Sequence, residues 1–367
     1  MSEKRKTIAV TLIFFALLLL PQLLQHLVRS ESDTTAENRN PAPFPRTFKY
    51  RKFASEFEEF YNDRIPFRSQ LLKYCEQIQR GLFTFTLGNA IAGKNGFCFY
   101  TPRSQENTYL QYTGKLHLPY YKMEKNRRFL EKLHQELARK NIKFLWAVAP
   151  DKIQIYPEYL PERRRTLESP SAPAEKFRRH LDNARSPVPR LFLKETLLAN
   201  KRFSGKLFYR ADTHWSRVGG YLGAREIISH FTRGSTPLPE AGKFRIYSRG
   251  GHYEPDDMKN QLLHRAVFKR HPECFPLVPS FTGKVEEVSR GYLRTRNPAA
   301  PDRRKVLIYR DSFTINMLPY LSYHFAEVHY LWTHKVSLSQ IEQLSPDIVI
   351  LEYVSRLLVK MQNKLRL

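Results

Sequence analysis

The sequence predicts an α/β domain built on a central, mainly parallel sheet and preceded by an N-terminal transmembrane helix. Residues 142–149 (IKFLWAVA) form a short, almost wholly apolar run, which is typical of a strand buried on both faces. Three similar runs at 305–309, 327–331 and 347–351 alternate with helix candidates. Strands that alternate with helices indicate crossovers between parallel strands, with helices on both faces of the sheet.

The N-terminal residues predict a membrane anchor. Lys4, Arg5 and Lys6 precede residues 7–28, which contain no charged side chain. Crossing a bilayer as a helix takes roughly 20 mostly apolar residues, and a basic cluster in front keeps the N-terminus in the cytoplasm. A cleaved signal peptide shares these features, but residues 27–29 make a poor cleavage site, and a buried core helix suits the basic start less well. We therefore expect a retained anchor in the inner membrane and a periplasmic domain.

The other elements follow in chain order. Residues 29–48 are polar and rich in proline at their end, which indicates a linker. This divides the chain into an anchor (1–28), a linker (29–48) and one folded domain (49–367). Aromatic residues at helical spacing predict a helix at 53–61, and an apolar face predicts a longer one over 116–141. Further helices are expected near 315–325 and 338–344 and at the end of the chain.

Composition limits the class of partner. The chain has 367 residues with 13 % aromatics, which excludes a disordered chain, and its net charge of +26 suits an anionic partner. An exported protein does not normally meet genomic DNA, so we expect an acidic glycan or lipid headgroups and no nucleic acid. Cys75, Cys98 and Cys274 allow at most one disulfide, and no pair has metal-ligand spacing.

A serine follows one of the predicted strands. Ser312 comes shortly after the strand at 305–309, and ligands of such sheets bind outside the carboxyl ends of the strands. Free backbone N–H groups at the start of the next helix would stabilise a developing oxyanion there. Ser312 is therefore a candidate nucleophile. The alternative is a serine that only caps the helix.

A serine nucleophile needs a base, and one histidine has a carboxylate beside it. Asp212 and His214 are two residues apart, so in an extended segment both side chains would point the same way. Asp212 would then orient the imidazole, whose other nitrogen would face Ser312. The alternative is an Asp–His pair at the surface or a histidine satisfied in the core.

Several short blocks together resemble a known family. Residues 212–215 (DTHW), followed by Gly219 and Gly220, are similar to the D-x-H-W signature of the alginate O-acetyltransferase family AlgJ/AlgX, and residues 309–313 (YRDSF) resemble its nucleophile block. Further similar blocks lie at 61–68, 93–97, 149–161, 256–262 and 352–356. The resemblance runs from about residue 61 to residue 356, and the order of the blocks makes it specific.

The resemblance implies a three-layer α/β/α domain of the SGNH-hydrolase type, with Ser312 as nucleophile, His214 as general base and Asp212 as its orienting residue. It also implies transfer of acetyl groups to an exported polysaccharide through an acetyl-serine, with a membrane-bound O-acyltransferase as the acetyl supplier and no cofactor or metal. The same triad would serve a glycan acetylesterase, and a non-catalytic subunit of a polysaccharide-modifying complex would keep the same fold.

Three further residues are secondary candidates for substrate contact. These are Arg310, Tyr353 and Arg356, although Arg356 could equally be a charge on the surface of a helix. The family often has glycine where this chain has Arg310 and Asp256. The first difference bears on the approach to the nucleophile, and the second makes the match of its block looser.

Overall fold

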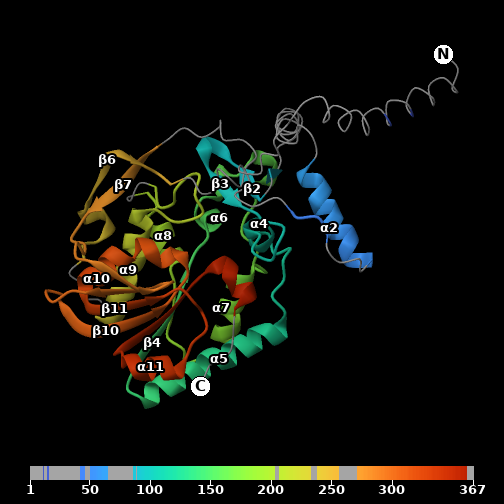
Figure 1. Cartoon of the computed structure of the whole chain (residues 1–367). Helices are drawn as coiled ribbons and strands as arrows, with labels where there is room; N and C mark the ends of the chain where they lie inside the picture. Colours follow the sequence, from blue (N-terminus) through green and yellow to red (C-terminus); the bar gives the residue numbers. More distant parts are fainter. Residues whose placement is uncertain are drawn as a thin grey trace. The chain divides into compact units, whose positions relative to one another are not determined.

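The computed structural model describes residues 11, 15, 42–45, 50–64, 86–87, 89–202, 206–232, 238–255 and 271–361 (Figure 1). The chain divides into two compact units, Met1–Gly88 with Lys259–Val267 and Asn89–Met258 with Phe268–Leu367. The predicted anchor lies outside the described residues apart from Thr11 and Phe15, and so does most of the predicted linker. No helix in the described part of the chain combines the length and apolarity needed to cross a bilayer.

The first unit contains helix α2 (Tyr50–Asp63) and the short strand β1 (Thr86–Leu87). Helix α2 confirms the helix predicted at 53–61. Its aromatic side chains lie one turn apart, and the ring of Phe57 stacks on Phe53 at 5.8 Å and on Tyr61 at 6.3 Å. The predicted aromatic stripe therefore forms one side of this helix.

The second unit is built on a seven-stranded sheet with the order β5-β4-β12-β10-β11-β9-β8. Its strands are β4 (Lys143–Ala149), β5 (Arg190–Phe192), β8 (Val285–Ser289), β9 (Tyr292–Arg296), β10 (Asp302–Tyr309), β11 (Phe325–Leu331) and β12 (Ile348–Val354). All neighbours from β5 to β11 pair in parallel, which confirms the mainly parallel sheet. The four predicted strands are β4, β10, β11 and β12.

Two antiparallel strands complete the sheet, and the sequence did not predict them. Strand β9 pairs with β11, and β8 pairs with β9 at the edge. Side chains of β8 are nearly all exposed and those of β9 are half-buried. Neither strand therefore carries the apolar alternation by which a strand is recognised in a sequence.

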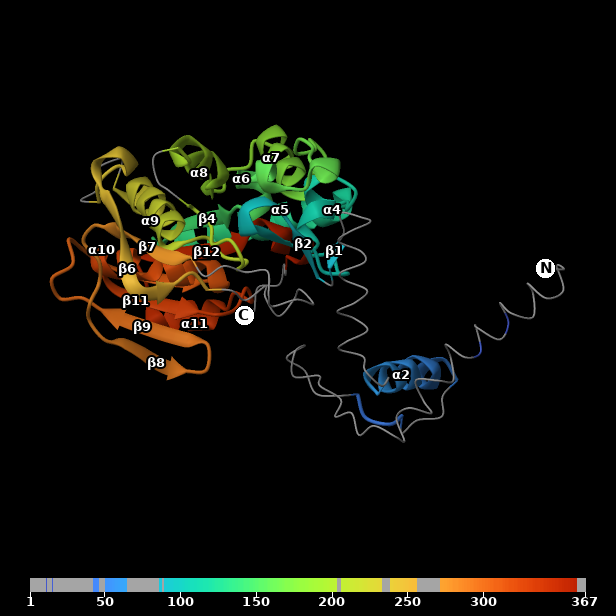
Figure 2. The same cartoon turned by 90° about the horizontal axis from the view of Figure 1, so that it is seen from above.

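Helices cover both faces of this sheet, as predicted (Figures 1 and 2). They are α4 (Thr108–Tyr112), α5 (Tyr120–Arg139), α6 (Lys152–Ile155), α7 (Pro173–Asn183), α8 (Lys194–Asn200), α9 (Arg217–Phe231), α10 (Leu318–His324) and α11 (Leu338–Leu344). Val306 and Ile308 of β10 belong to an apolar cluster with residues of α9 and α10. Leu307 and Tyr309 belong to a second cluster with residues of α5, α7 and α11. The alternating side chains of one strand thus build two cores, and the unit has three layers.

The helix predicted at 315–325 is split in two. A 3₁₀ helix, η8 (Ser312–Asn316), is followed by α10, which has Pro319 in its first turn. Proline is favoured at the start of a helix and cannot continue the hydrogen bonding of a preceding one, so a new helix begins there. The predicted helix at the end of the chain is the 3₁₀ helix η9 (Ser355–Lys360). Two hairpins, β2–β3 (Ala90–Ala92 and Cys98–Tyr100) and β6–β7 (Arg245–Tyr253 and Pro272–Leu277), lie outside the main sheet.

Helix α9 lies directly against η8 because it carries glycine at the contact. A Cβ on Gly220 would lie 2.4 Å from the backbone oxygen of Asn316. Two hydrogen bonds close the same contact: the Trp215 indole N–H donates to Phe313 O at 2.8 Å, and the Asn316 amide donates to Trp215 O at 2.7 Å. The segment before α9 is thereby tied to the segment that contains Ser312.

We expect Gly220→Ala to destabilise the protein by about 1–3 kcal/mol, because the added methyl group meets backbone that has to move. Urea unfolding of the variant and of the parent measures this. Gly242→Ala is the matched control, since a Cβ there has no neighbour within 4 Å. Equal stabilities of Gly220→Ala and the parent would show that the two helices are not in close contact.

Candidate active site

Ser312 stands at the carboxyl edge of the sheet, where β10 ends. The N-cap residue of η8 is Asp311, so the alternative that Ser312 merely caps a helix is wrong. Asp311 is buried, and its carboxylate accepts the N–H of Phe313 at 2.8 Å and the N–H of Val354 in β12 at 2.7 Å. One side chain thus fastens the turn that carries Ser312 to the neighbouring strand.

The structure brings Ser312, His214 and Asp212 together. His214 Nε2 lies 2.7 Å from Ser312 Oγ, and His214 Nδ1 lies 2.7 Å from Asp212 Oδ1. The imidazole is 23 % exposed, whereas Asp212 is buried. The chain of contacts is the one that a serine nucleophile with a histidine base requires. That these residues are catalytic stays a prediction from this geometry.

The backbone that carries the pair differs from the extended segment that we expected. Residues 210–214 form a tight loop closed by a bridge between Phe208 and Trp215. Asp212 Oδ1 also accepts the backbone N–H of His214 at 2.8 Å. The two side chains therefore meet because one carboxylate oxygen bonds both the backbone and the ring of the same residue, as in an Asx-type turn.

The surroundings of Asp212 keep it ionised. Burial opposes its charge, but the hydrogen bonds from the ring and the backbone of His214 and the nearby charge of Lys152 outweigh burial and lower the pKa of Asp212. A carboxylate at this place accepts the Nδ1 proton of His214, and Nε2 is then the nitrogen that receives the Ser312 proton.

A buried lysine holds the Asp212 loop in place, and sequence reasoning missed its role. The Lys152 ammonium donates to three backbone oxygens, those of Cys98 at 2.9 Å, Arg210 at 2.8 Å and Asp212 at 2.6 Å. Lys152 follows β4 at the same edge of the sheet as Ser312. Its position after a buried strand was the available signal, but the carbonyls that it binds belong to distant segments.

A buried glutamate stabilises the turn that carries Ser312. Glu352 is fully buried in β12, and its Oε2 accepts the N–H of Asp311 at 3.1 Å and the hydroxyl of Thr314 at 2.9 Å. Burial and the nearby charge of Asp311 raise the pKa of Glu352 well above its usual range. The protonated form of Glu352 is thereby favoured, which reduces repulsion between the two buried carboxyl groups.

The three secondary candidates are all buried. Tyr353 packs in the core and stacks on His334 at 3.7 Å, and the Arg310 guanidinium lies 4.7 Å from the ring of Trp332. The alternative that Arg356 is a surface charge is wrong, because Arg356 is buried and pairs with Asp151. Because they are buried, these side chains are better placed to stabilise the surroundings of the site than to contact a large substrate directly.

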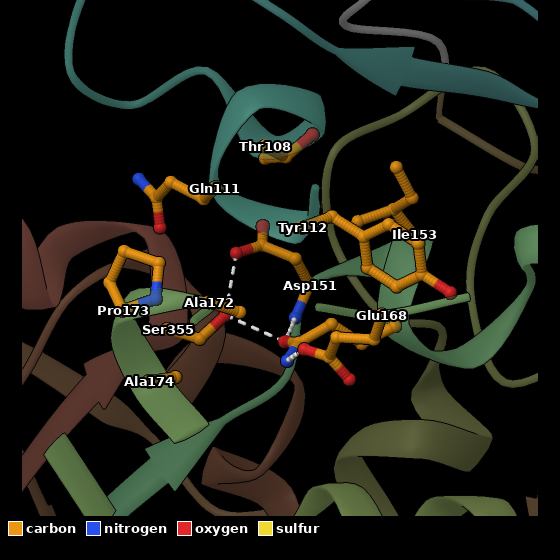
Figure 3. A pocket seen from close by; sticks show the side chains of 11 residues that line it. Thr108, Gln111, Tyr112, Asp151, Ile153, Glu168, Ala172, Pro173, Ala174 and Ser355 are labelled. Carbon is orange, nitrogen blue, oxygen red and sulfur yellow. Dashed lines mark hydrogen bonds between the residues drawn. The ribbon is translucent and has the colours of Figure 1, made fainter. Parts of the chain in front are cut away.

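Asp151 follows β4 and binds the segment that follows β12, beside a small cavity (Figure 3). Its Oδ2 accepts the Ser355 hydroxyl at 2.7 Å and the Arg356 N–H at 2.9 Å. The cavity has a volume of about 10 Å³ and is lined by residues that include Thr108, Asp151 and Ser355. That volume holds about one water molecule, so the cavity belongs to the support of the site and does not admit a sugar. Nowhere in the described ranges do three His, Cys, Asp or Glu side chains converge as metal ligands.

The raised pKa of Glu352 predicts a pH dependence of stability. Below the pKa of an unfolded glutamate both states are protonated, and the stabilising contribution of neutral Glu352 is fully present. As the pH rises, ionisation favours the unfolded chain, so stability is lost by up to about 1.4 kcal/mol per pH unit. Glu352→Gln removes this dependence. We therefore expect the wild type to lose stability relative to Glu352→Gln between pH 5 and pH 8 in denaturant unfolding.

The control for this comparison is Glu287→Gln, which changes an exposed glutamate of β8. Its stability difference from the wild type should stay small across the same pH range. If the difference between Glu352→Gln and the wild type is constant with pH, Glu352 is already ionised and does not support the Ser312 turn as a neutral acid.

Comparison with known proteins finds a matching domain and two relatives, all named for acetyl transfer. Residues 104–282 match the SGNH hydrolase-like domain of the acetyltransferase AlgX, a range that contains Asp212 and His214. The chain is 23 % identical over 199 residues to the probable alginate O-acetylase AlgJ of Azotobacter vinelandii, covering 53 % of this chain and 47 % of that protein. It is 25 % identical over 178 residues to the probable alginate O-acetylase AlgJ of Pseudomonas aeruginosa, covering 48 % and 41 %. The chain thus spans less than half the length of these curated relatives.

A solved structure agrees on the fold. PatB1 of Bacillus cereus superposes with a TM-score of 0.50 at 17 % identity, over 66 % of this chain and 94 % of that chain. This structural likeness covers more of the chain than residues 104–282, and it concerns the fold. The matched domain and the two sequence relatives make this chain similar to the AlgJ/AlgX family of SGNH-hydrolase-like proteins, and the solved structure agrees on the fold alone.

Proposed function

We propose that this protein is an O-acetyltransferase that adds acetyl groups to an exported or cell-surface polysaccharide through an acetyl-serine at Ser312. The observation that carries the proposal is the pair of 2.7 Å contacts linking Asp212, His214 and Ser312. Similarity to two proteins that are named as probable alginate O-acetylases supports the substrate class. Water in place of the sugar would make the same site a glycan acetylesterase, and loss of catalysis would leave a non-catalytic subunit.

The reaction proceeds in two steps. Ser312 Oγ attacks the acetyl carbonyl while His214 Nε2 takes its proton, and the donor leaves with that proton, so that acetyl-serine remains. A sugar hydroxyl then gives its proton to Nε2 and attacks the acetyl-serine, and Ser312 Oγ leaves and recovers the proton. In each step, Asp212 stabilises the imidazolium that exists after His214 has taken a proton and before it gives that proton up. The enzyme ends each cycle in its starting state.

The oxyanion formed in each step needs a donor beside Ser312. We expected several free backbone N–H groups there, but the N–H of Phe313 is already donated to Asp311. The N–H of Ser312 itself is therefore the backbone donor that we assign to the oxyanion. Its position is set by Asp311 and Glu352 on either side of the turn.

The partners that we propose are a membrane-bound O-acyltransferase that supplies the acetyl group and an exported, acidic polysaccharide that receives it. The net charge of +26 supports both an anionic acceptor and a position near anionic lipid headgroups. We also propose that residues 7–28 anchor the protein in the inner membrane with its catalytic domain in the periplasm.

We expect Ser312→Ala to abolish the acetylation that depends on this protein, because Ser312 Oγ is the hydroxyl in contact with His214 Nε2. Loss of a triad member lowers turnover by about 10³-fold or more. The measurement is the acetyl content of surface glycans in a deletion strain complemented with each variant. Ser339→Ala, which removes an exposed hydroxyl on α11, is the matched control and should restore acetylation fully. Unchanged acetylation with Ser312→Ala would show that this protein is not catalytic.

Transfer and hydrolysis are separated with the purified full-length protein, a small acetyl ester as donor and the de-O-acetylated surface polysaccharide as acceptor. We expect acetylated polysaccharide to form in the wild type and not in Ser312→Ala. Release of acetate without acetylated polysaccharide would identify an esterase.

A further inference from the structure

One tryptophan lies exposed at the edge of the sheet that carries the site. The chain has three tryptophans. Trp146 and Trp215 are fully buried, whereas Trp332 is 58 % exposed. Large aromatic side chains are mostly buried in folded proteins. Trp332 directly follows β11, at the carboxyl ends of the parallel strands, which is where ligands of such sheets bind.

Trp332 lies close to the nucleophile. Strands β10 and β11 are neighbours with Tyr309 opposite Leu331, and the N–H of Arg310 donates to Leu331 O at 2.9 Å. Trp332 and Arg310 are the next residues on the two strands, and Ser312 is two residues beyond Arg310. Neighbouring strands lie ~5 Å apart, and two residues span at most about 7 Å. The backbones of Trp332 and Ser312 therefore lie within roughly 12 Å of each other.

The indole of Trp332 packs on Arg310, and its main chain is hydrogen-bonded to a neighbouring segment. The Arg310 guanidinium is buried and lies 4.7 Å from the centre of the ring. The backbone N–H of Trp332 donates to Gly291 O at 2.8 Å, which fixes the main chain that carries the side chain. Arg310 thus covers one face of the ring. The exposed part of the Trp332 side chain is the part that Arg310 does not cover. A rigid aromatic surface that faces solvent loses little entropy when a ligand packs on it.

A second exposed apolar side chain lies beside Ser312. Ile315 is 44 % exposed and is three residues after Ser312 in η8. Side chains three residues apart in a 3₁₀ helix are nearly eclipsed, so Ile315 and Ser312 lie on the same side of η8. The nucleophile therefore has exposed apolar surface on its own helix and on the adjacent strand end.

We propose that Trp332 is a stacking platform for a pyranose ring of the acceptor polysaccharide, with Ile315 as a second apolar contact closer to Ser312. The inference rests on the proposed function and names the place where the acceptor lies. The C–H bonds on one face of a pyranose carry partial positive charge and pack on the electron-rich face of an indole. An acetyl donor needs only the space at Ser312, whereas a polymer needs an open surface that extends from it.

The platform is tested by the balance between transfer and hydrolysis. Full-length wild type, Trp332→Ala and Trp332→Phe are supplied with p-nitrophenyl acetate and with de-O-acetylated surface polysaccharide of the producing strain. We expect the ratio of glycan acetylation to ester hydrolysis to fall about tenfold in Trp332→Ala, the loss of one good stacking contact. Trp332→Phe keeps an aromatic face and should retain most of that ratio.

Val285→Ala is the matched control, because it removes an exposed apolar side chain of the same sheet on the edge strand β8. Its ratio should equal that of the wild type. An unchanged ratio in Trp332→Ala, whether both rates are kept or both fall equally, would overturn the proposal, since Trp332 would then serve the acetyl step or the fold.

Binding is measured separately from chemistry by tryptophan fluorescence. Since Trp146 and Trp215 are fully buried, iodide quenching reports on Trp332. We expect the polysaccharide to protect this fluorescence from iodide in Ser312→Ala, which cannot be acetylated, and to have no such effect in Trp332→Phe. Absence of protection in Ser312→Ala would overturn the platform. A wild type that never acetylates the polysaccharide but is still protected would overturn the transferase function and leave the binding site standing.

Discussion

The site depends on one buried carboxylate, that of Asp311. It joins the end of β10, the first turn of η8 and the backbone of β12 through the N–H groups of Phe313 and Val354. Burial of this polar group is tolerated because both oxygens accept hydrogen bonds from the main chain. Burial and the nearby charge of Asp311 raise the pKa of its neighbour Glu352, whose Oε2 in turn accepts the N–H of Asp311. The position of Ser312 thus depends on two buried carboxyl groups and on the main-chain N–H groups that they accept.

The other half of the site is held by a cation. Lys152 binds three backbone oxygens, including that of Asp212, and its charge helps to keep Asp212 ionised. The two halves meet where the Trp215 indole donates to Phe313 O and the Asn316 amide donates to Trp215 O. Both hydrogen bonds need the close approach that Gly220 permits. Buried polar groups of this kind are stabilising only when every partner is present, so the loop and the nucleophile turn are ordered together.

Much of the fold could be predicted because its signals are local. The apolar runs that became β4, β10, β11 and β12 reflect burial on both faces, and the strand-helix alternation implied parallel pairing. The polar strands β8 and β9 carried no such signal, because their side chains are exposed or half-exposed. The expectation of an extended Asp212 segment failed for a related reason: the turn is made by a side-chain bond to the backbone, which residue spacing alone does not reveal.

The sequence by itself predicted the class of sheet, the resemblance to the AlgJ/AlgX family and the three residues of the candidate triad, because each of these depends on short contiguous blocks. Only the tertiary structure decided that Ser312 and His214, which are 98 residues apart, lie in hydrogen-bond contact. It also decided that Arg356 is buried against Asp151, 205 residues away, and that Trp332 is exposed beside Arg310. Local patterns report how a segment meets water, whereas contacts between distant segments depend on how the whole chain packs.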